Sequence, residues 1–312
     1  MASPCLIVKL IALFSLLHVC FASRILTTTP VGDTQGQQQQ LLRYHNGTLL
    51  RGKIAVNLIW YGKFMPSQRA IVADFITSLS RSTSPPARNR QPSVAMWWKT
   101  IERFYRLAGT KNPNSLSLHL GKQILDEKYS LGKSLSKKQV VQLASKGDIV
   151  NAVNVVLTAS DVAVDGFCVN RCGTHGSKRA PCEWEEKEVL QVDLYLGWQL
   201  GASMPRVLRL AIPPAHLRPT EPATGCAQQR RGPGRATNPF GNGFYQGPKE
   251  APLEAATACT GVYGSGAYPG YAGKLLVDQS TGASYNARGA NGRKYLLPAI
   301  YDPSTSICST LV

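Results

Sequence analysis

The sequence is poor in charged residues and lacks the common catalytic motifs. Charged side chains make up 17% of its 312 residues, against about 25% in an average soluble protein. No HExxH, GxSxG or Walker sequence is present, so the signatures of zinc peptidases, serine hydrolases and P-loop enzymes are missing. No apolar stretch of the chain is long enough to cross a bilayer. We therefore expect no catalysis, no cofactor, no bound metal and no transmembrane segment.

Acidic residues are scarce as well. The chain has 18 of them against 35 basic residues, which gives a formal net charge of +17. A basic surface favours acidic partners, such as anionic polysaccharide, nucleic acid or a phosphate-bearing membrane.

The N-terminus narrows this choice, because Lys9 precedes the apolar run "LIALFSLLHVCFAS". The run is too short for a membrane span and ends in small residues, as a secretory signal peptide does before its cleavage site. A short buried helix is the alternative. We predict a signal peptide over residues 1–22, a flexible lead-in over 23–43 and one domain over 44–312. Secretion to the extracellular space favours polysaccharide or another secreted protein as the partner and argues against nucleic acid.

Cysteine usage agrees with secretion. Two of the eight cysteines fall in the predicted signal peptide, and the other six are Cys168, Cys172, Cys182, Cys226, Cys259 and Cys308. We expect disulfides rather than a zinc site, because "CVNRC" has no matching Cys or His pair nearby. Six cysteines allow many pairings, so the connectivity stays open. Secretion also makes the sequon Asn46-Gly47-Thr48 a predicted N-glycosylation site.

Helical and strand patterns alternate along the first half of the chain. Strand periodicity occurs in residues 52–62 and 115–125, residues 152–168 supply one or two further strands, and helical periodicity occurs in residues 66–80, 94–109 and 136–147. The last of these helices begins with a capping box, Ser136 and Gln139. We assign Trp97 and Trp98 to the core rather than to a sugar-binding surface. The alternation indicates a single mixed layered domain of the α/β or α+β class.

Five blocks of the sequence resemble one plant family. They are "AVNLIWYGKF", "PSVAMWWKTIERFY", "DGFCVNRCGTHG", "TNPFGNGFYQGPKEAPLEAATACTGVYGSGAYPGYAGKLLVD" and "YLLPAIYDPSTSICSTLV". These blocks are similar to the EXORDIUM proteins, also called phosphate-induced proteins. The resemblance implies a secreted protein of the apoplast and cell wall, linked to growth regulation and brassinosteroid response, without an established catalytic activity.

Residues 181–235 depart from that family. Codons can be chosen for Met204–His216 that, shifted by one nucleotide, spell Cys-Pro-Gly-Ser-Cys-Ala-Trp-Pro-Phe-His-Gln-Pro, as the family has at this place. We therefore interpret residues 181–235 as out of frame, although part of this segment, residues 183–200, has a composition compatible with a helix. Cys182 and Cys226 are then accidental, which leaves Cys168, Cys172, Cys259 and Cys308 as disulfide candidates.

Two alternative functions depend on the C-terminal part. The glycine-rich segment "GVYGSGAYPGYAG" places Tyr263, Tyr268 and Tyr271 in turns, where exposed rings would stack on sugars and make the chain a cell-wall carbohydrate-binding protein. "TNPFGNGFYQGPKEAPLEAATAC" resembles the segment after the zinc-binding helix of some secreted metallopeptidases. That likeness implies a distant zincin-like scaffold that has lost its metal.

Overall fold

The structure, a computed structural model, describes residues 42–80, 91–109, 116–148, 150–166, 236–248, 252–255 and 257–312, together with the backbone of residues 174–178 and 191–195. The predicted signal peptide, most of the lead-in, Cys168 and Cys172, and most of residues 181–235 lie outside the described residues. Leu42 is buried and Arg43 pairs in a strand, so these two residues belong to the domain rather than to the lead-in.

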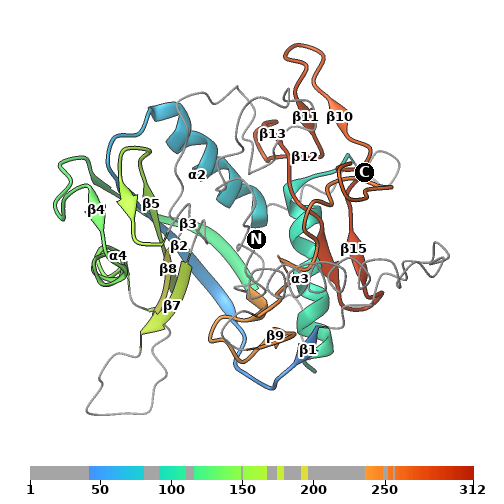
Figure 1. Cartoon of the computed structure of the whole chain (residues 1–312), viewed down its shortest axis with the longest axis horizontal. Helices are drawn as coiled ribbons and strands as arrows, with labels where there is room; N and C mark the ends of the chain where they lie inside the picture. Colours follow the sequence, from blue (N-terminus) through green and yellow to red (C-terminus); the bar gives the residue numbers. More distant parts are fainter. Residues whose placement is uncertain are drawn as a thin grey trace, which may run out of the picture. The chain divides into compact units, whose positions relative to one another are not determined.

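A five-stranded sheet dominates the first half of the domain (Figure 1). Its order is β3-β2-β5-β8-β7, and its strands are β2 (Gly52–Tyr61), β3 (Leu116–Asp126), β5 (Ala152–Thr158), β7 (Thr174–Lys178) and β8 (Gln191–Tyr195). The first four in this order run parallel, and β7 pairs antiparallel with β8. The predicted strands over 52–62 and 115–125 are confirmed, and the segment 152–168 contains β5 as predicted. The helix considered for 183–200 is wrong at residues 191–195, which form β8.

Three helices of the described part connect these strands. α2 (Pro66–Ser80) and α3 (Val94–Leu107) lie between β2 and β3, and α4 (Lys137–Ala144) lies between β3 and β5. α2 packs on β3, and α4 packs on β5 and β8. Connections between parallel strands are right-handed, and these two run in opposite directions across the sheet, so the helices cover opposite faces. The capping box is confirmed: the Ser136 hydroxyl accepts from the Gln139 N–H, and the Gln139 side chain accepts from the Ser136 N–H.

Small antiparallel pairs form most of the remainder. They are β1 (Arg43–Tyr44) with β9 (Phe244–Tyr245), β10 (Leu276–Val277) with β11 (Ser284–Tyr285), β12 (Ala287–Arg288) with β13 (Lys294–Tyr295), and β14 (Ile300–Asp302) with β15 (Ile307–Ser309). A parallel pair, β4 (Ser134–Leu135) with β6 (Ala163–Val164), lies beside α4. α3 contacts β12 and β14. The Trp97 indole N–H donates to the Pro298 carbonyl at 2.6 Å, and Arg103 forms an ion pair with Asp302.

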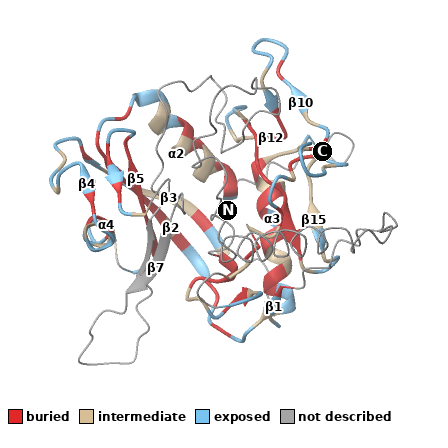
Figure 2. Ribbon diagram, in the orientation of Figure 1, coloured by how far each residue is buried: buried red, intermediate tan, exposed pale blue. Residues whose placement is uncertain are grey.

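The core follows from this layering (Figure 2). Every residue of β5 and most residues of β2 are buried, because helices cover both faces of the parallel part of the sheet. Trp97 and Trp98 are buried as predicted. In the part of the chain that the structure describes, no helix is both long and apolar enough to cross a membrane.

Two buried asparagines face each other on the central strands. The Asn57 amide donates to the Asn154 side chain at 2.9 Å, and the Asn154 amide donates to the Asp148 carbonyl at 2.9 Å. The Asn57 oxygen accepts from the Lys122 backbone N–H at 2.8 Å, where the β2–β3 register shifts. A Cβ on Gly147 would lie 1.9 Å from the Asn154 oxygen, so this position requires glycine. The pair satisfies polar groups that would otherwise be unpaired in the core.

We predict that Asn154→Ala lowers the free energy of unfolding by about 2–3 kcal/mol, because the Asn57 amide then loses its acceptor in a dry environment. Urea denaturation followed by circular dichroism measures the change. Gln142→Ala, at an exposed position of α4, is the control and should stay within about 0.5 kcal/mol of the wild type. Equal effects of the two substitutions would contradict the role given to the asparagine pair.

Candidate functional site

Tyr268 and Tyr271 sit on either side of a tight turn. The Tyr268 N–H donates to the Tyr271 carbonyl at 3.0 Å, and the Tyr271 N–H donates to the Tyr268 carbonyl at 2.8 Å. Pro269 and Gly270 lie between them, and Gly270 has φ +91°. Proline followed by a glycine with positive φ forms a type II turn. The two tyrosines are therefore directly opposite each other, which places their side chains on the same face.

The two rings form an exposed aromatic surface. Tyr268 is 65% exposed and Tyr271 is 38% exposed. Their ring centroids are 5.1 Å apart, with the ring planes tilted by 40°. The prediction that Tyr263 joins them is wrong: it is 1% exposed, because its backbone turns inward to pair with Ala272 and Asn286. The sugar-stacking candidates that remain on the surface are Tyr268 and Tyr271.

The segment that carries this turn is held at several points. Cys259 and Cys308 form a disulfide with a Cα–Cα distance of 5.7 Å, and Cys259 is buried. The Ser265 N–H donates to the Val312 carbonyl at 2.7 Å. A Cβ on Gly264 would lie 1.8 Å from the Lys274 carbonyl oxygen, so only glycine allows the two chain segments to approach this closely. The tyrosine turn thus projects from a fixed base.

The predicted glycosylation site is accessible. Asn46 is exposed and follows β1 in a turn where its φ is +57°. The next residue fixes this turn, because the Gly47 N–H donates to the Asn242 carbonyl at 2.9 Å and the Gly47 carbonyl accepts from the Tyr44 hydroxyl at 2.8 Å. Asn46 therefore points outward from a braced turn, and its glycosylation stays a prediction.

The segment that resembles the metallopeptidases is packed into the domain. Thr237 and Asn238 are fully buried, and the Asn238 amide donates to the buried Glu254 carboxylate at 2.8 Å. The Asn238 oxygen accepts from the Gly243 N–H at 2.8 Å, which closes the intervening turn. The described residues contain no group of three or more His, Cys, Asp or Glu side chains placed to hold a metal. The Asn238–Glu254 pair is structural here, and the zincin-like scaffold stays a prediction.

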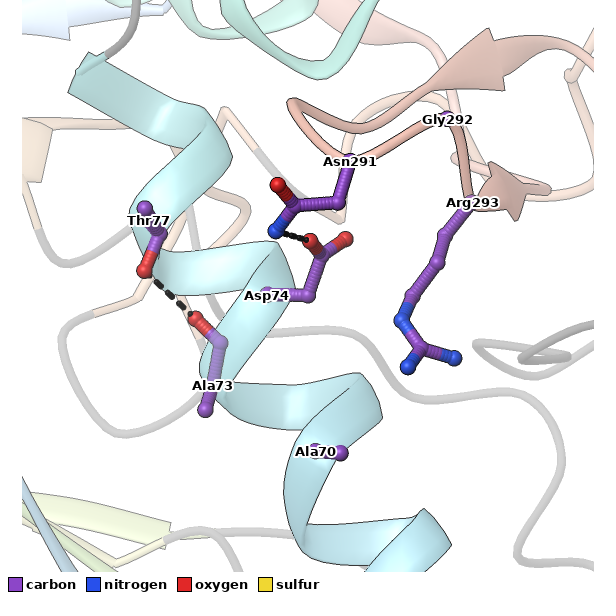
Figure 3. A pocket seen from close by; sticks show the side chains of 7 residues that line it. All are labelled: Ala70, Ala73, Asp74, Thr77, Asn291, Gly292 and Arg293. Atoms are coloured by element: carbon purple, nitrogen blue, oxygen red, sulfur yellow. Dashed lines mark hydrogen bonds between the residues drawn. The ribbon is translucent and has the colours of Figure 1, made fainter.

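A pocket that the sequence interpretation missed lies between α2 and the turn after β12 (Figure 3). Ala70, Ala73, Asp74 and Thr77 line it from the helix, and residues 291–293 line it from the turn. Its volume is about 670 Å³, within the range of about 300–1,000 Å³ typical of small-molecule sites. The pocket therefore has the size of a ligand site.

Asp74 is the buried anion of this pocket, with 5% of its surface exposed. Its carboxylate accepts from the Tyr295 hydroxyl at 2.6 Å and from the Asn291 amide. One turn along the helix, the Ser78 hydroxyl accepts from the Ala290 N–H at 2.7 Å. A Cβ on Gly289 would lie 2.6 Å from the Asp74 carboxylate, so glycine is needed where the turn meets the helix.

A signal for this pocket existed in the sequence. The helical spacing of Val72, Phe75, Ile76 and Leu79 predicts that these residues form the inner face of residues 66–80. The structure buries Ile71, Asp74, Ser78 and Leu79 and leaves the other three apolar residues partly exposed. An aspartate and a serine one turn apart on a helix face mark a possible polar contact, but the sequence does not reveal their partners.

We predict that Tyr295→Phe lowers stability by about 1.5–3 kcal/mol at pH 8, because it removes a hydrogen bond to a buried carboxylate. Burial, and then the hydrogen bond to Asp74, raise the pKa of Tyr295 well above its ordinary value of 10.0. Above pH 10 a tyrosine in the unfolded chain loses its proton while Tyr295 in the folded chain keeps it, so the wild type loses stability as the pH rises.

Denaturant unfolding of both proteins at pH 8 and pH 11 checks this prediction. The stability difference between them should shrink at the higher pH. Burial also raises the pKa of Tyr105. Because Tyr105 is present in both proteins, its contribution cancels in the stability difference. A difference that stays constant between the two pH values would contradict the assignment to Tyr295.

Comparison with known proteins identifies the family. The conserved region of phosphate-induced protein 1 matches residues 42–192 and 232–311. The chain is 57% identical to Protein PHOSPHATE-INDUCED 1 of Nicotiana tabacum over 324 residues, with 100% of both chains covered. It is 53% identical to Protein EXORDIUM of Arabidopsis thaliana, which covers 98% of this chain and 99% of the relative. Protein EXORDIUM-like 1 of the same plant is 49% identical over 96% of each chain.

No solved protein structure is significantly similar to this chain. The interruption of the family match, residues 193–231, falls within the segment interpreted as out of frame. On both sides of it the match is extensive. The chain therefore belongs to the phosphate-induced protein 1 family, which includes the EXORDIUM and EXORDIUM-like proteins.

Proposed function

We propose that this chain is a secreted, non-enzymatic protein of the plant apoplast and cell wall that acts in growth regulation and brassinosteroid response. Support for growth regulation comes from the membership in the EXORDIUM family over nearly the whole length of the chain. Support for a non-enzymatic role comes from the sequence, which has none of the common catalytic motifs.

The observation that carries secretion is the disulfide between Cys259 and Cys308. Disulfides persist in oxidising compartments and are rare in the cytosol. This one joins residues 49 positions apart and anchors the segment that bears the tyrosine turn. It agrees with the apolar run after Lys9, which has the features of a cleavable signal peptide.

Secretion is tested with the full chain fused at its C-terminus to a fluorescent protein in plant cells. We expect the fusion in the wall and in apoplastic fluid, with Cys259 and Cys308 protected from alkylation until they are reduced. The control lacks residues 2–22 and should remain inside the cell with both thiols reactive. Retention of the full-length fusion in the cytosol would contradict the proposal.

Polysaccharide binding is the second candidate function, and the exposed pair Tyr268 and Tyr271 favours it. Each ring presents a flat apolar face with a polar hydroxyl, which suits the alternating C–H and O–H surfaces of a sugar chain. Two adjacent rings, fixed by one turn, offer contact to neighbouring sugar units with little loss of side-chain entropy. The net charge of +17 favours an acidic polysaccharide over a neutral one.

We predict that replacing both Tyr268 and Tyr271 by alanine reduces retention on immobilised pectin or cellulose at least about tenfold, which corresponds to about 1.4 kcal/mol. Each ring contributes through apolar contact that alanine cannot make. The matched control replaces Leu276 and Val277, two exposed apolar residues of β10, by alanine. Retention should persist in the control, and a similar loss in both double variants would indicate nonspecific hydrophobic adsorption instead.

A further inference from the structure

The pocket beside α2 is lined by a cation, Arg293, that has no charged partner among the described residues. Arg293 is exposed and extends along the pocket opposite the helix (Figure 3). Within the described residues it forms no ion pair, whereas its neighbour Lys294 pairs with Asp278 at 2.9 Å. Arg288, on the same hairpin, lies over the Tyr285 ring at 5.5 Å. Arg288 also has one N–H bonded to the Tyr285 hydroxyl at 3.2 Å, whereas the Arg293 guanidinium lines the pocket and is free to bind an anion there.

The floor of the pocket provides acceptors for hydroxyl groups. Each oxygen of the Asp74 carboxylate accepts one described hydrogen bond, from Asn291 or from Tyr295. A carboxylate oxygen has room for a second donor. The Asn291 amide has a carbonyl oxygen and a second N–H beyond the bond to Asp74. These groups sit across the pocket from Arg293, so an occupant meets acceptors on one side and a fork of donors on the other.

Three small residues form the apolar part of the wall, beside the polar Thr77. Ala70 and Ala73 face the pocket from α2, and Gly292, with φ +76°, closes the turn on the other side. Methyl and methylene surfaces of this kind suit the C–H face of a sugar ring. These side chains are also small enough to leave room for the ring. The occupant that fits all three features carries hydroxyls, a C–H face and one negative charge.

We propose that this pocket binds a uronic acid, the carboxylate-bearing unit of acidic polysaccharides. The carboxylate of the sugar accepts two N–H bonds from the Arg293 guanidinium, which is the geometry that arginine offers to planar anions. Ring hydroxyls donate to Asp74 and exchange hydrogen bonds with the Asn291 amide. The proposal goes beyond the stacking of sugars on Tyr268 and Tyr271, because it assigns a separate site with a charge preference.

Calorimetric titration of the purified mature protein with D-galacturonate tests the proposal. A sugar acid of this size bound with ordinary ligand efficiency should give a Kd of about 1 mM. Galactose, in which a hydroxymethyl group replaces the carboxylate, should bind at least about tenfold more weakly, because the charge-assisted bonds to Arg293 are lost. Inorganic phosphate serves as an anion without ring hydroxyls and should bind more weakly than galacturonate.

Two variants locate the site, and two others serve as controls. Arg293→Ala should weaken galacturonate binding at least about tenfold, and Ala73→Leu, which fills the pocket without changing charge, should abolish it. The control Arg43→Ala removes an equal charge from the exposed side of β1, well away from β13 in Figure 1, and should leave the affinity unchanged. The double tyrosine variant should retain galacturonate binding, which separates this proposal from polysaccharide retention.

Several outcomes would overturn the proposal. They are the absence of galacturonate binding by the wild type at 10 mM, ten times the expected Kd of about 1 mM, equal affinity for galactose, and equal or stronger binding of phosphate. Equal losses of galacturonate affinity in Arg293→Ala and Arg43→Ala would also contradict the proposal, because they would show that general charge attraction explains the binding. The side-chain amide resonance of Asn291 gives a direct check, since it should shift during the titration in the wild type and stay unchanged in Ala73→Leu.

Discussion

The buried carboxylate of Asp74 is the contact on which the arrangement of the C-terminal hairpins depends. Taking a carboxylate out of water is unfavourable unless donors replace the water, and here the donors come from Asn291 and Tyr295, more than 200 residues away in the chain. The neighbouring Ser78 hydroxyl accepts a hydrogen bond from the Ala290 N–H. The hairpin β12–β13 is thus fixed to helix α2 by polar contacts that no apolar surface could direct as specifically. Removing the carboxylate alone would leave the buried Tyr295 hydroxyl with only the Ile71 carbonyl, at 3.1 Å, as an acceptor, and would remove the acceptor of the Asn291 amide.

The same contact explains why a pocket exists beside the helix. The turn over residues 289–293 is held at its base by Asp74 and Ser78, so its tip does not collapse onto α2. Ala70 and Ala73 are too small to fill the space that remains. A second surface, the tyrosine turn, projects from the segment anchored by the Cys259–Cys308 disulfide. Both candidate sites therefore lie on loops positioned by a rigid base, which is where binding residues commonly occur.

Much of the local structure was predictable from the sequence, because periodicity and caps are encoded in short stretches. Pro66 begins α2, Ser136 and Gln139 cap α4, and the strand predicted over residues 52–62 is an interior strand of the sheet. The long-range partners were not predictable. Asn57 and Asn154 look like polar interruptions of two apolar strands until the parallel register sets them opposite each other. The prediction of an exposed Tyr263 was wrong for a related reason. Tyr263 lies in the same glycine-rich segment as Tyr268 and Tyr271, and it is buried only because the loop folds back. Strand β8 was missed because residues 183–200 were interpreted as compatible with a helix, although Val192 and Leu194 alternate with polar neighbours as in a strand.

The atypical segment lies between two points that the fold constrains. The family match stops at residue 192, inside β8, where residues 191–195 pair in parallel register with β5. It resumes at residue 232, four positions before Ala236, which is buried and whose carbonyl accepts a hydrogen bond from the Tyr105 hydroxyl at 3.0 Å. The family match therefore extends into both ends of the segment interpreted as out of frame, because it includes residues 181–192 and 232–235. Strand β8 lies inside that segment and still pairs with β5. The bounds 181–235 are thus wider than the interruption of the match, and the out-of-frame interpretation stays a prediction for residues 193–231.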